Sequence, residues 1–131
     1  MLARPSLILC LFLLACSFVL GCGSSGPPLG AVTGAVTLNG QPLENAQVTF
    51  KPETGRPSLG TTDQQGKYSL RFTQDEAGAM VGSHTVTIST AIDLPDDTRA
   101  PERVPAKYNT QSDLVREVKP GNNVFNFELT D

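Results

Sequence analysis

The sequence predicts an all-β domain with the strand pattern of a β-sandwich. Apolar and polar side chains alternate in the stretches 34–38, 46–50 and 68–72, and a period of two means that each strand buries one face. Two turns separate these stretches: Asn39-Gly40, which suits a type I′ turn because both central residues need positive φ, and Asp63-Gln64-Gln65-Gly66. Twelve glycines and ten prolines also favour a turn-rich β-protein over a helical one.

We expect seven strands, separated by turns at spacings that suit a sandwich. Their ranges are 32–38, 46–51, 59–62, 67–72, 83–90, 114–118 and 124–129. Pro120-Gly121-Asn122-Asn123 is expected to make the last hairpin, after which Phe125, Phe127 and Leu129 share the inward face and complete the core. No stretch of ten or more residues has the 3.6-residue period of a helix.

The amino terminus has the layout of a secretory signal. Residues 1–6 carry one positive charge, Arg4, and fourteen uncharged residues follow at 7–20. An uncleaved membrane anchor is the alternative, but a span needs about 20 apolar residues and this run is shorter. We therefore expect residues 1–21 to be removed, 22–30 to form a Gly/Ser/Pro tether and 31–131 to form one domain.

The end of this signal, Val19-Leu20-Gly21-Cys22, resembles a bacterial lipobox. The resemblance implies cleavage before Cys22, acylation of Cys22 with fatty acids such as palmitate, and a membrane-anchored lipoprotein of the bacterial cell envelope. Cys10 and Cys16 would leave with the signal, so the mature domain would have no disulfide and no cysteine-based metal or nucleophile site. Gly23 is not the aspartate associated with inner-membrane retention in enteric bacteria, which favours the outer membrane.

The stretch 32–90 resembles the carboxypeptidase regulatory-like domain. The shared elements are Gly34-x-Val36, Asn39-Gly40-x-Pro42-Leu43, Ala46-x-Val48-x-Phe50, Thr62-Asp63-x-x-Gly66-x-Tyr68-x-Leu70 and Gly82-x-His84-x-Val86-x-Ile88. This resemblance implies a seven-stranded Greek-key β-sandwich of the transthyretin-like (prealbumin-like) kind. It implies no particular activity, because the shared residues belong to turns and core.

A second resemblance involves the carboxyl-terminal part of the chain. Pro105-Ala106-Lys107-Tyr108, with the later Val118-x-x-Gly121-x-Asn123, is similar to the tails of small lipoproteins that are common in planctomycete bacteria.

Charge and residue types argue against several functions. The formal net charge is −3 and the basic residues are scattered, whereas nucleic-acid binding needs a basic stripe. His84 is the only histidine, and its parity with Val86 and Ile88 indicates a packed structural residue at the rim of the inward face. A hydrolase centred on His84 is the least favoured alternative, because no GxSxG motif is present. We expect no enzymatic activity, no cofactor and no metal, since zinc needs several His or Cys ligands.

The long loop 91–113 is the unusual feature, because loops of this length are often functional or else disordered. Asp93, Asp96 and Asp97 could offer oxygens to calcium, but their spacing does not match an EF-hand loop, and a solvated acidic loop is favoured. Tyr108, beside Lys107, either anchors the loop through its hydroxyl or offers a face for stacking. The candidate ligand-binding residues are Tyr108, Lys107, Asp96 and Asp97.

Two functions follow from these observations. The first is a non-enzymatic, lipid-anchored envelope module with a structural or protein-interaction role, whose contact surface is formed by the loops 51–59 and 91–113. The alternative is a module that binds carbohydrate or peptidoglycan through Tyr108 and the loop carboxylates. The partners are then the membrane, through lipid on Cys22, and an envelope protein or a cell-wall glycan.

Overall fold

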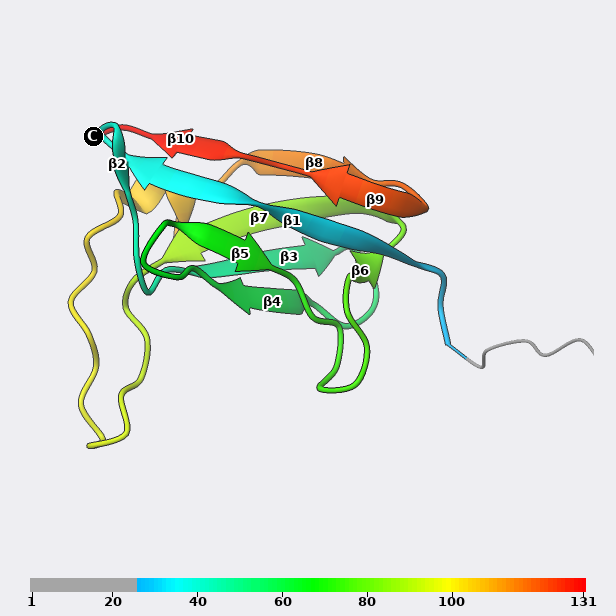
Figure 1. The fold of residues 1–131 in the computed structure, drawn as a ribbon, viewed down its shortest axis with the longest axis horizontal. Coiled ribbons are helices and arrows are strands. Elements are labelled where there is room, and N and C mark those ends of the chain that lie inside the picture. Colours follow the sequence, from blue (N-terminus) through cyan, green and yellow to red (C-terminus); the bar gives the residue numbers. More distant parts are fainter. Residues whose placement is uncertain (1–25) are drawn as a thin grey trace, which may run out of the picture.

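The computed structural model describes residues 26–131, which form ten strands and one short 3₁₀ helix (Figure 1). In chain order the elements are β1 (Leu29–Leu38), β2 (Gln41–Pro42), β3 (Gln47–Pro52), β4 (Ser58–Thr61), β5 (Lys67–Ser69), β6 (Ala79–Met80), β7 (Gly82–Ser89), η2 (Ala106–Tyr108), β8 (Leu114–Val118), β9 (Gly121–Val124) and β10 (Phe127–Leu129). The strands form two sheets that enclose one core, so the prediction of an all-β, sandwich-like domain is confirmed. β1 begins at Leu29, slightly before the boundary expected at residue 31.

The first sheet is built around β1. On one side β1 runs parallel to β9 and then to β10. On the other side it runs antiparallel to β6, β5 and β2, which cover successive parts of its length. The even-numbered residues Val32 and Val36 of β1 face the core between the sheets and are buried at 1% and 0% exposure.

The second sheet is antiparallel, in the order β4-β3-β7-β8. The two sheets are joined along one side by a bridge between Leu59 and Arg71, whose backbone amides and carbonyls exchange hydrogen bonds of 3.1 and 2.9 Å. On the opposite side β8 and β10 are not paired with each other. There the guanidinium of Arg116 lies 5.1 Å from the centre of the Phe127 ring, and an inward-pointing charge of this kind protects an open sheet edge.

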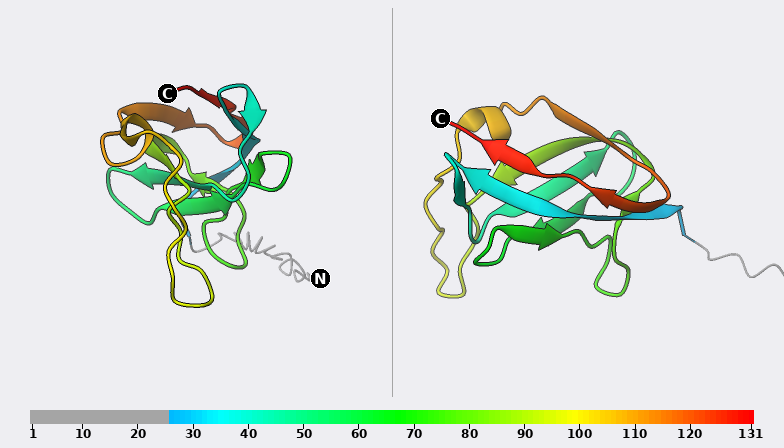
Figure 2. Two further views of the ribbon diagram at one scale, coloured as in Figure 1. Left: turned by 90° about the vertical axis from the view of Figure 1, so that its left-hand side faces the viewer. Right: turned by 45° about the horizontal axis from the view of Figure 1, so that its top comes forward.

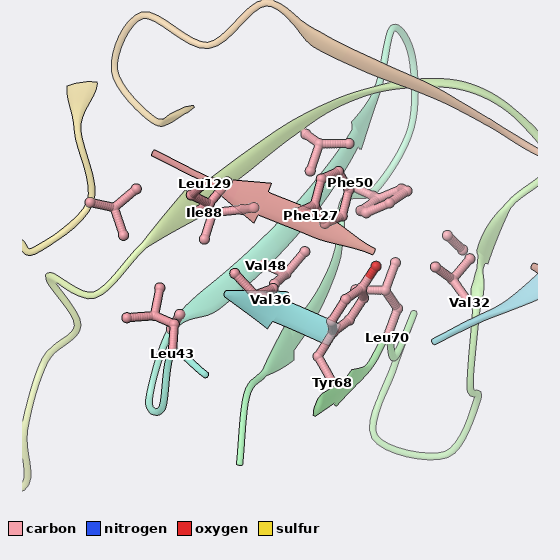
Figure 3. Packing of buried hydrophobic residues seen from close by; sticks show 14 of the residues in the cluster. Val32, Val36, Leu43, Val48, Phe50, Tyr68, Leu70, Ile88, Phe127 and Leu129 are labelled. Atoms are coloured by element: carbon pink, nitrogen blue, oxygen red, sulfur yellow. The ribbon is translucent and has the colours of Figure 1, made fainter. Parts of the chain in front are cut away.

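The core lies between the sheets and consists of aliphatic residues around Phe50 (Figure 3). The ring of Phe50 packs against Phe125 at 5.8 Å and against Phe127 at 6.4 Å between centroids. Most of the predicted inward residues are buried: Val36, Ala46, Val48, Phe50, Tyr68, Leu70, Val86, Ile88, Phe127 and Leu129. Leu38, Phe72 and Phe125, which were predicted to share these faces, are half-buried. The alternation in the sequence therefore identified most of this core.

Gly34 lies on β1 at the point where the parallel partner of β1 changes from β9 to β10. The carbonyl oxygen of Phe125 is 1.8 Å, and the Tyr68 hydroxyl oxygen 2.9 Å, from the position that a Cβ on Gly34 would occupy. The Tyr68 hydroxyl donates a 2.6 Å hydrogen bond to that same Phe125 carbonyl. The amide of Ala35 donates a 2.9 Å bond to Oδ1 of Asn126, which fills the gap in the ladder. Glycine is required here because any side chain would collide with the backbone of residue 125.

Both predicted turns are present. Asn39 and Gly40 have φ values of 52° and 84°, as a type I′ turn requires, and they join β1 to β2. In the second turn Oδ1 of Asp63 accepts hydrogen bonds of 2.8 and 2.9 Å from the amides of Gln65 and Lys67. Gly66 adopts φ 77° in this turn.

Other expectations about strands need correction. The described residues form ten strands in place of seven, and the strand expected at 124–129 is divided into β9 and β10. The hairpin expected at Pro120-Gly121-Asn122-Asn123 is wrong: β8 belongs to the second sheet, whereas β9 pairs with β1 in the first. Asn123 holds this crossing, because its side-chain amide donates to the carbonyls of Ala31 at 3.0 Å and Lys119 at 2.8 Å.

The molecule has two distinct ends along its long axis (Figures 1 and 2). At one end, which we call the tether end, Leu29 pairs with Met80, Gly30 pairs with Gly121, and the β3–β4 loop lies against Met80. The other end, which we call the far end, holds the β1–β2 turn, the segment 91–113 and the carboxyl terminus. The chain thus enters the domain at one end and presents its longest loop at the other.

Candidate functional site

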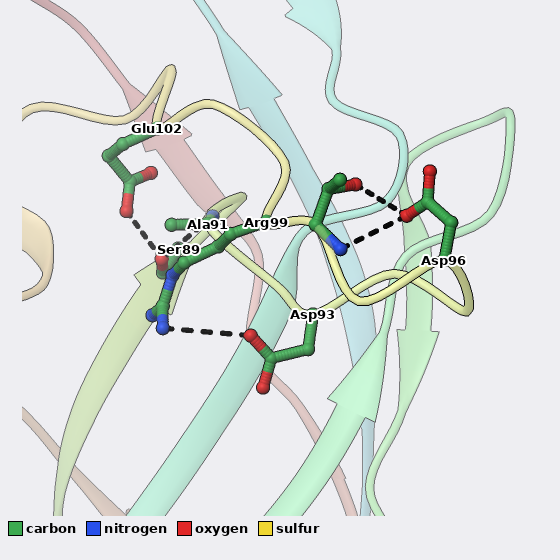
Figure 4. Close-up of polar contacts among 7 residues, drawn as sticks. Ser89, Ala91, Asp93, Asp96, Arg99 and Glu102 are labelled. Carbon is green, nitrogen blue, oxygen red and sulfur yellow. Dashed lines mark hydrogen bonds and ion pairs between the residues drawn. The ribbon is translucent and has the colours of Figure 1, made fainter.

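The segment 91–113 starts with a hairpin that projects from the far end (Figures 1 and 4). The amide of Ala100 donates to the carbonyl of Ile92 at 2.9 Å, and the amide of Leu94 donates to the carbonyl of Thr98 at 2.8 Å. Asp97, at the tip, has φ 66°, a conformation that Asp tolerates better than most residues. Local backbone bonds therefore define this hairpin.

The carboxylates of the hairpin are used within it. Oδ1 of Asp96 accepts hydrogen bonds from the amide of Thr98 at 3.1 Å and from its hydroxyl at 2.5 Å, and these bonds lower the pKa of Asp96. Asp93 forms an exposed ion pair with Arg99 at 3.7 Å, which contributes little to stability. Within residues 26–131 no group of three or more His, Cys, Asp or Glu side chains is arranged to hold a metal ion. The calcium hypothesis for Asp93, Asp96 and Asp97 therefore gains no geometric support.

Glu102 ties the second half of the segment to the end of β7 (Figure 4). Its Oε1 accepts hydrogen bonds from the amides of Thr90 at 2.9 Å and Val104 at 3.1 Å, while its Oε2 accepts one from the Ser89 hydroxyl. The Thr90 hydroxyl in turn accepts a 2.7 Å bond from the amide of Arg103. One carboxylate thus joins the end of β7 to the backbone at Val104.

The electrostatics of Glu102 reflect these contacts. Partial burial raises its pKa, but the hydrogen bonds from Ser89, Thr90 and Val104 outweigh burial, and the pKa lies below the usual value of 4.5. The ionised carboxylate is therefore the form that the far end stabilises.

Asn109 and Ser112 fix the rest of the segment to the backbone of β7. The side-chain amide nitrogen of Asn109 lies 3.2 Å from the carbonyl oxygens of Ile88, Val104 and Pro105. The Ser112 hydroxyl donates a 2.5 Å bond to the carbonyl of Val86. Residues 101–112 are consequently held to β7 by side-chain bonds, unlike the hairpin that precedes them.

Tyr108 and Lys107 lie together on η2. The Tyr108 hydroxyl accepts a 3.1 Å hydrogen bond from the amide of Thr130, and this bond lowers the pKa of the Tyr108 phenol. The Lys107 ammonium lies 5.2 Å from the centre of the Tyr108 ring, in cation–π geometry. Of the two roles considered for Tyr108, the hydroxyl anchor is the one these contacts describe.

The four candidate ligand-binding residues do not form one site. Lys107 and Tyr108 lie on η2, whereas Asp96 and Asp97 lie at the hairpin tip, which points away from η2 (Figures 1 and 2). The loop at 51–59 is farther still, because Pro52 pairs with His84 at the tether end of β7. The two loops expected to form one contact surface are therefore at opposite ends.

Sequence reasoning did not find Glu102 and Asn109. Neither residue belongs to an alternating strand or a turn motif. The contacts that tie them to β7 and to Thr90 span 12 and 13 residues for Glu102 and 21 residues for Asn109. No local signal marks such a contact. The acidic residues of the hairpin were conspicuous in the sequence only because they are clustered.

His84 is a structural residue, as predicted. It is 2% exposed, its ring packs 5.7 Å from the Phe50 ring, and its Nε2 lies 2.6 Å from the carbonyl oxygen of Met80. Because a carbonyl can only accept, Nε2 carries the proton. A hollow of about 420 Å³ is lined by His84 together with exposed residues that include Lys51, Thr85 and Val115.

The predicted lipidation site, Cys22, and the signal at 1–21 lie outside the described residues. Within the described part of the chain, no helix has the length and hydrophobicity needed to span a membrane.

Comparisons with known proteins give similarity to solved structures only. No family model and no curated protein matches the sequence. A crystal structure of a DUF3823 family protein from Parabacteroides merdae is similar to this chain, with a TM-score of 0.47 and 16% identity over 79% of the chain. The chain spans 47% of the length of that structure. This likeness assigns no function to the chain.

Proposed function

We propose that this protein is a lipid-anchored, non-enzymatic module of the bacterial cell envelope, with a structural or protein-interaction role. The observation that carries the proposal is the arrangement of the two ends. The chain enters at Leu29, whereas the segment 91–113 is held at the far end by Glu102 and Asn109. An anchor at Cys22 would turn this segment away from the membrane, where a partner can reach it.

The finer fold assignment belongs to the same proposal. We place the domain among carboxypeptidase regulatory-like, Greek-key sandwiches of the transthyretin-like kind, on the strength of the motif residues Gly34, Gly66 and Tyr68. Gly34 and Tyr68 meet at the Phe125 carbonyl, and Gly66 occupies a positive-φ turn position. A physical requirement thus supports each of these three motif positions.

A non-enzymatic role is supported by the surroundings of the residues that could do chemistry. His84 is buried and bonded to the backbone, and Glu102 is fully engaged in positioning the segment 91–113. Carbohydrate or peptidoglycan binding through Tyr108 is the second candidate. It is less well supported than protein contact, because the Lys107 ammonium lies over the Tyr108 ring.

The anchor is tested by expressing the full chain in a bacterium and measuring intact mass and detergent partitioning. The proposal predicts a mature species that starts at Cys22 and carries acyl mass, in the outer-membrane fraction. Cys22→Ala should lose the acyl mass and the partitioning, whereas the matched control Cys16→Ala, inside the signal, should retain both. A mature protein that keeps residues 1–21, or that is released without acyl groups, would contradict the proposal.

The interaction role is tested at the far end of the anchored protein. A photo-crosslinking residue at Thr110, which is exposed at the far end, should yield a discrete envelope adduct. The same probe at Gln74, on the exposed loop at the tether end, is the positional control and should not yield that adduct. Identical adducts from both positions, or none from Thr110, would argue against a partner at this end.

A further inference from the structure

A groove near the tether end combines arginine and apolar side chains. It has a volume of about 370 Å³ and is lined by Arg56, Pro57, Leu59, Arg71, Phe72, Thr73 and Gln74. The charged residues of this lining are both arginines. Leu59 is 42% exposed and Phe72 is half-buried, so two guanidinium groups adjoin accessible apolar surface.

Neither arginine is neutralised by a carboxylate. The ion pair found among residues 26–131 joins Arg99 to Asp93, at the other end of the molecule. Arg56 lies 5.9 Å from the centre of the Phe72 ring, and Arg71 donates a 3.1 Å hydrogen bond to the carbonyl of Gln74. These contacts orient the two guanidinium groups and leave donors available, and guanidinium is well suited to bind phosphate.

The groove lies near the point where the chain enters the domain. The loop that carries Arg56 contacts Met80, which pairs with Leu29 at the start of β1. The loop that follows Arg71 returns through a bridge between Arg71 and Ala77, and a Cβ on Gly26 would lie 4.0 Å from Oε2 of Glu76 on this loop. Asp75 and Glu76 are on the same loop but do not line the groove.

Chain length then limits the distance to a membrane. Four residue steps separate Gly26 from Cys22, and an extended chain covers at most about 3.3–3.6 Å per residue. An acyl group on Cys22 would therefore hold Gly26 within roughly 15 Å of the lipid surface. That distance is comparable with the Debye length of about 8–10 Å at physiological salt, so charges at this end can interact with lipid headgroups.

We propose that the Arg56–Arg71 groove docks on the phosphate headgroups of the anionic membrane that anchors Cys22. This inference rests on the proposed lipid anchor and adds an orientation: the tether end lies against the membrane and the far end points away from it. Phe72 and Leu59 supply apolar surface of the kind found at membrane interfaces.

The test uses the mature lipoprotein, purified with its anchor and reconstituted into vesicles. One set of vesicles is phosphatidylcholine alone, and the other contains 30 mol% (about one lipid in three) phosphatidylglycerol, a composition chosen to provide a negative surface. Hydrogen exchange is measured in the loops 53–57 and 72–78 and in the hairpin 92–100. The expected result is slower exchange in the two tether-end loops, only in anionic vesicles, with the hairpin unchanged.

Charge variants identify the groups responsible. Each arginine near an anionic surface should shift the docking equilibrium about fivefold, so Arg56→Gln/Arg71→Gln should weaken docking by about 25-fold. Lys67→Gln/Arg99→Gln removes the same charge at the far end and should leave protection unchanged. If the double variant folds poorly, Arg56→Gln alone should give the fivefold effect, because the Arg56 side chain is exposed and its contact is with the half-buried Phe72 ring.

The outcomes separate this inference from the anchor itself. Acyl mass on Cys22 with equal exchange in both vesicles would overturn the groove assignment and leave the anchor standing. Absence of acyl mass would remove the anchor and this inference together. Protection of the same loops by polygalacturonate in the absence of vesicles, but not by anionic vesicles, would overturn membrane docking and assign the groove to an acidic glycan.

Discussion

The two tyrosines hold the same carboxyl-terminal part of the chain in opposite ways. Tyr68 is 4% exposed and donates a 2.6 Å hydrogen bond to the carbonyl of Phe125, between the two sheets. Tyr108 is half-buried at the far end, and its hydroxyl accepts a 3.1 Å bond from the amide of Thr130. Burial raises the pKa of Tyr68 above 10.0, whereas the bond from Thr130 lowers the pKa of Tyr108.

This difference indicates which part of the structure each region stabilises. The Tyr68 region has no space for a side chain at Gly34, and the Tyr68 hydroxyl is bonded to the backbone that links β9 to β10, so the pairing of β1 with these strands depends on this region. The Tyr108 region, with Glu102 and Asn109, holds a loop whose bonds water can partly replace. Changes in the first region should therefore affect the whole fold, and changes in the second should affect the placement of the segment 91–113.

The largest effect is expected for Gly34→Ala. The new methyl group would meet the Phe125 carbonyl at 1.8 Å, so β1 or the 125–126 connection must move. We expect a loss of about 3 kcal/mol or more in the free energy of unfolding, measured by urea denaturation. Gly26→Ala is the control, because a Cβ there has no neighbour closer than 4.0 Å, and it should change the free energy of unfolding little. Equal stability of the two variants would refute the packing argument.

Tyr68→Phe should cost about 1–3 kcal/mol at neutral pH, because the Phe125 carbonyl loses its buried donor. The variant should also change how the free energy of unfolding depends on pH in the alkaline range. Above pH 10.0 the unfolded chain releases the Tyr68 proton before the folded chain does, so the free energy of unfolding falls as pH rises, by about 1.4 kcal/mol per pH unit. Denaturation between pH 9 and pH 11 (about one unit on each side) should show that slope reduced in Tyr68→Phe. An unchanged slope would mean that Tyr68 is not the group responsible.

Glu102→Gln should cost about 1 kcal/mol at pH 7, since the amide is a weaker acceptor for Ser89, Thr90 and Val104. The pKa of Glu102 is lowered in the fold, so its contribution is present above about pH 4.5 and is lost as pH falls through the folded pKa. Unfolding measured between pH 3 and pH 7 (a range of about four units) should show the two proteins converge at acid pH. The exposed Glu117→Gln is the matched control, and a cost that persists at acid pH would contradict this account.

Tyr108→Phe should have the smallest effect on global stability, within about 0.5 kcal/mol, because the Thr130 amide can bond to water instead. Its effect should be local: faster hydrogen exchange at Thr130, with no change at Phe125. A global loss as large as that of Tyr68→Phe would show that the two regions are not as different as their burial implies.

The part of the fold that the sequence predicted is the part governed by short-range rules. Alternation identified the inward residues around Phe50, and turn chemistry identified Asn39-Gly40 and Asp63 to Gly66. Alternation does not specify which strand lies beside which. For that reason the crossing at Lys119–Asn123, where β8 and β9 enter different sheets, was mistaken for a hairpin.

The candidate site was harder to predict, for a related reason. Asp96 and Asp97 formed a visible acidic cluster, yet the Asp96 carboxylate is used by Thr98 within its own hairpin. Glu102 is not part of an acidic cluster in the sequence, but its carboxylate accepts hydrogen bonds from the backbone amides of Thr90 and Val104. Whether a carboxylate binds a ligand or its own chain depends on contacts that sequence spacing does not reveal. Only the pairing of Lys107 with Tyr108 could be inferred, because the two are adjacent.

The parallel pairing of β1 with β9 and β10 has a mechanical consequence. β1 enters at the tether end, and β10 leaves at the far end in the same direction, with partners from Gly30–Gly121 to Leu38–Leu129. A pull between the amino and carboxyl termini would therefore load this ladder in shear, so that its hydrogen bonds must break together. Unzipping, in which bonds break one after another under a much smaller force, would require both strands to be pulled from the same end. A domain attached at one end and loaded at the other would resist extension through the parallel pairing of β1 with β9 and β10.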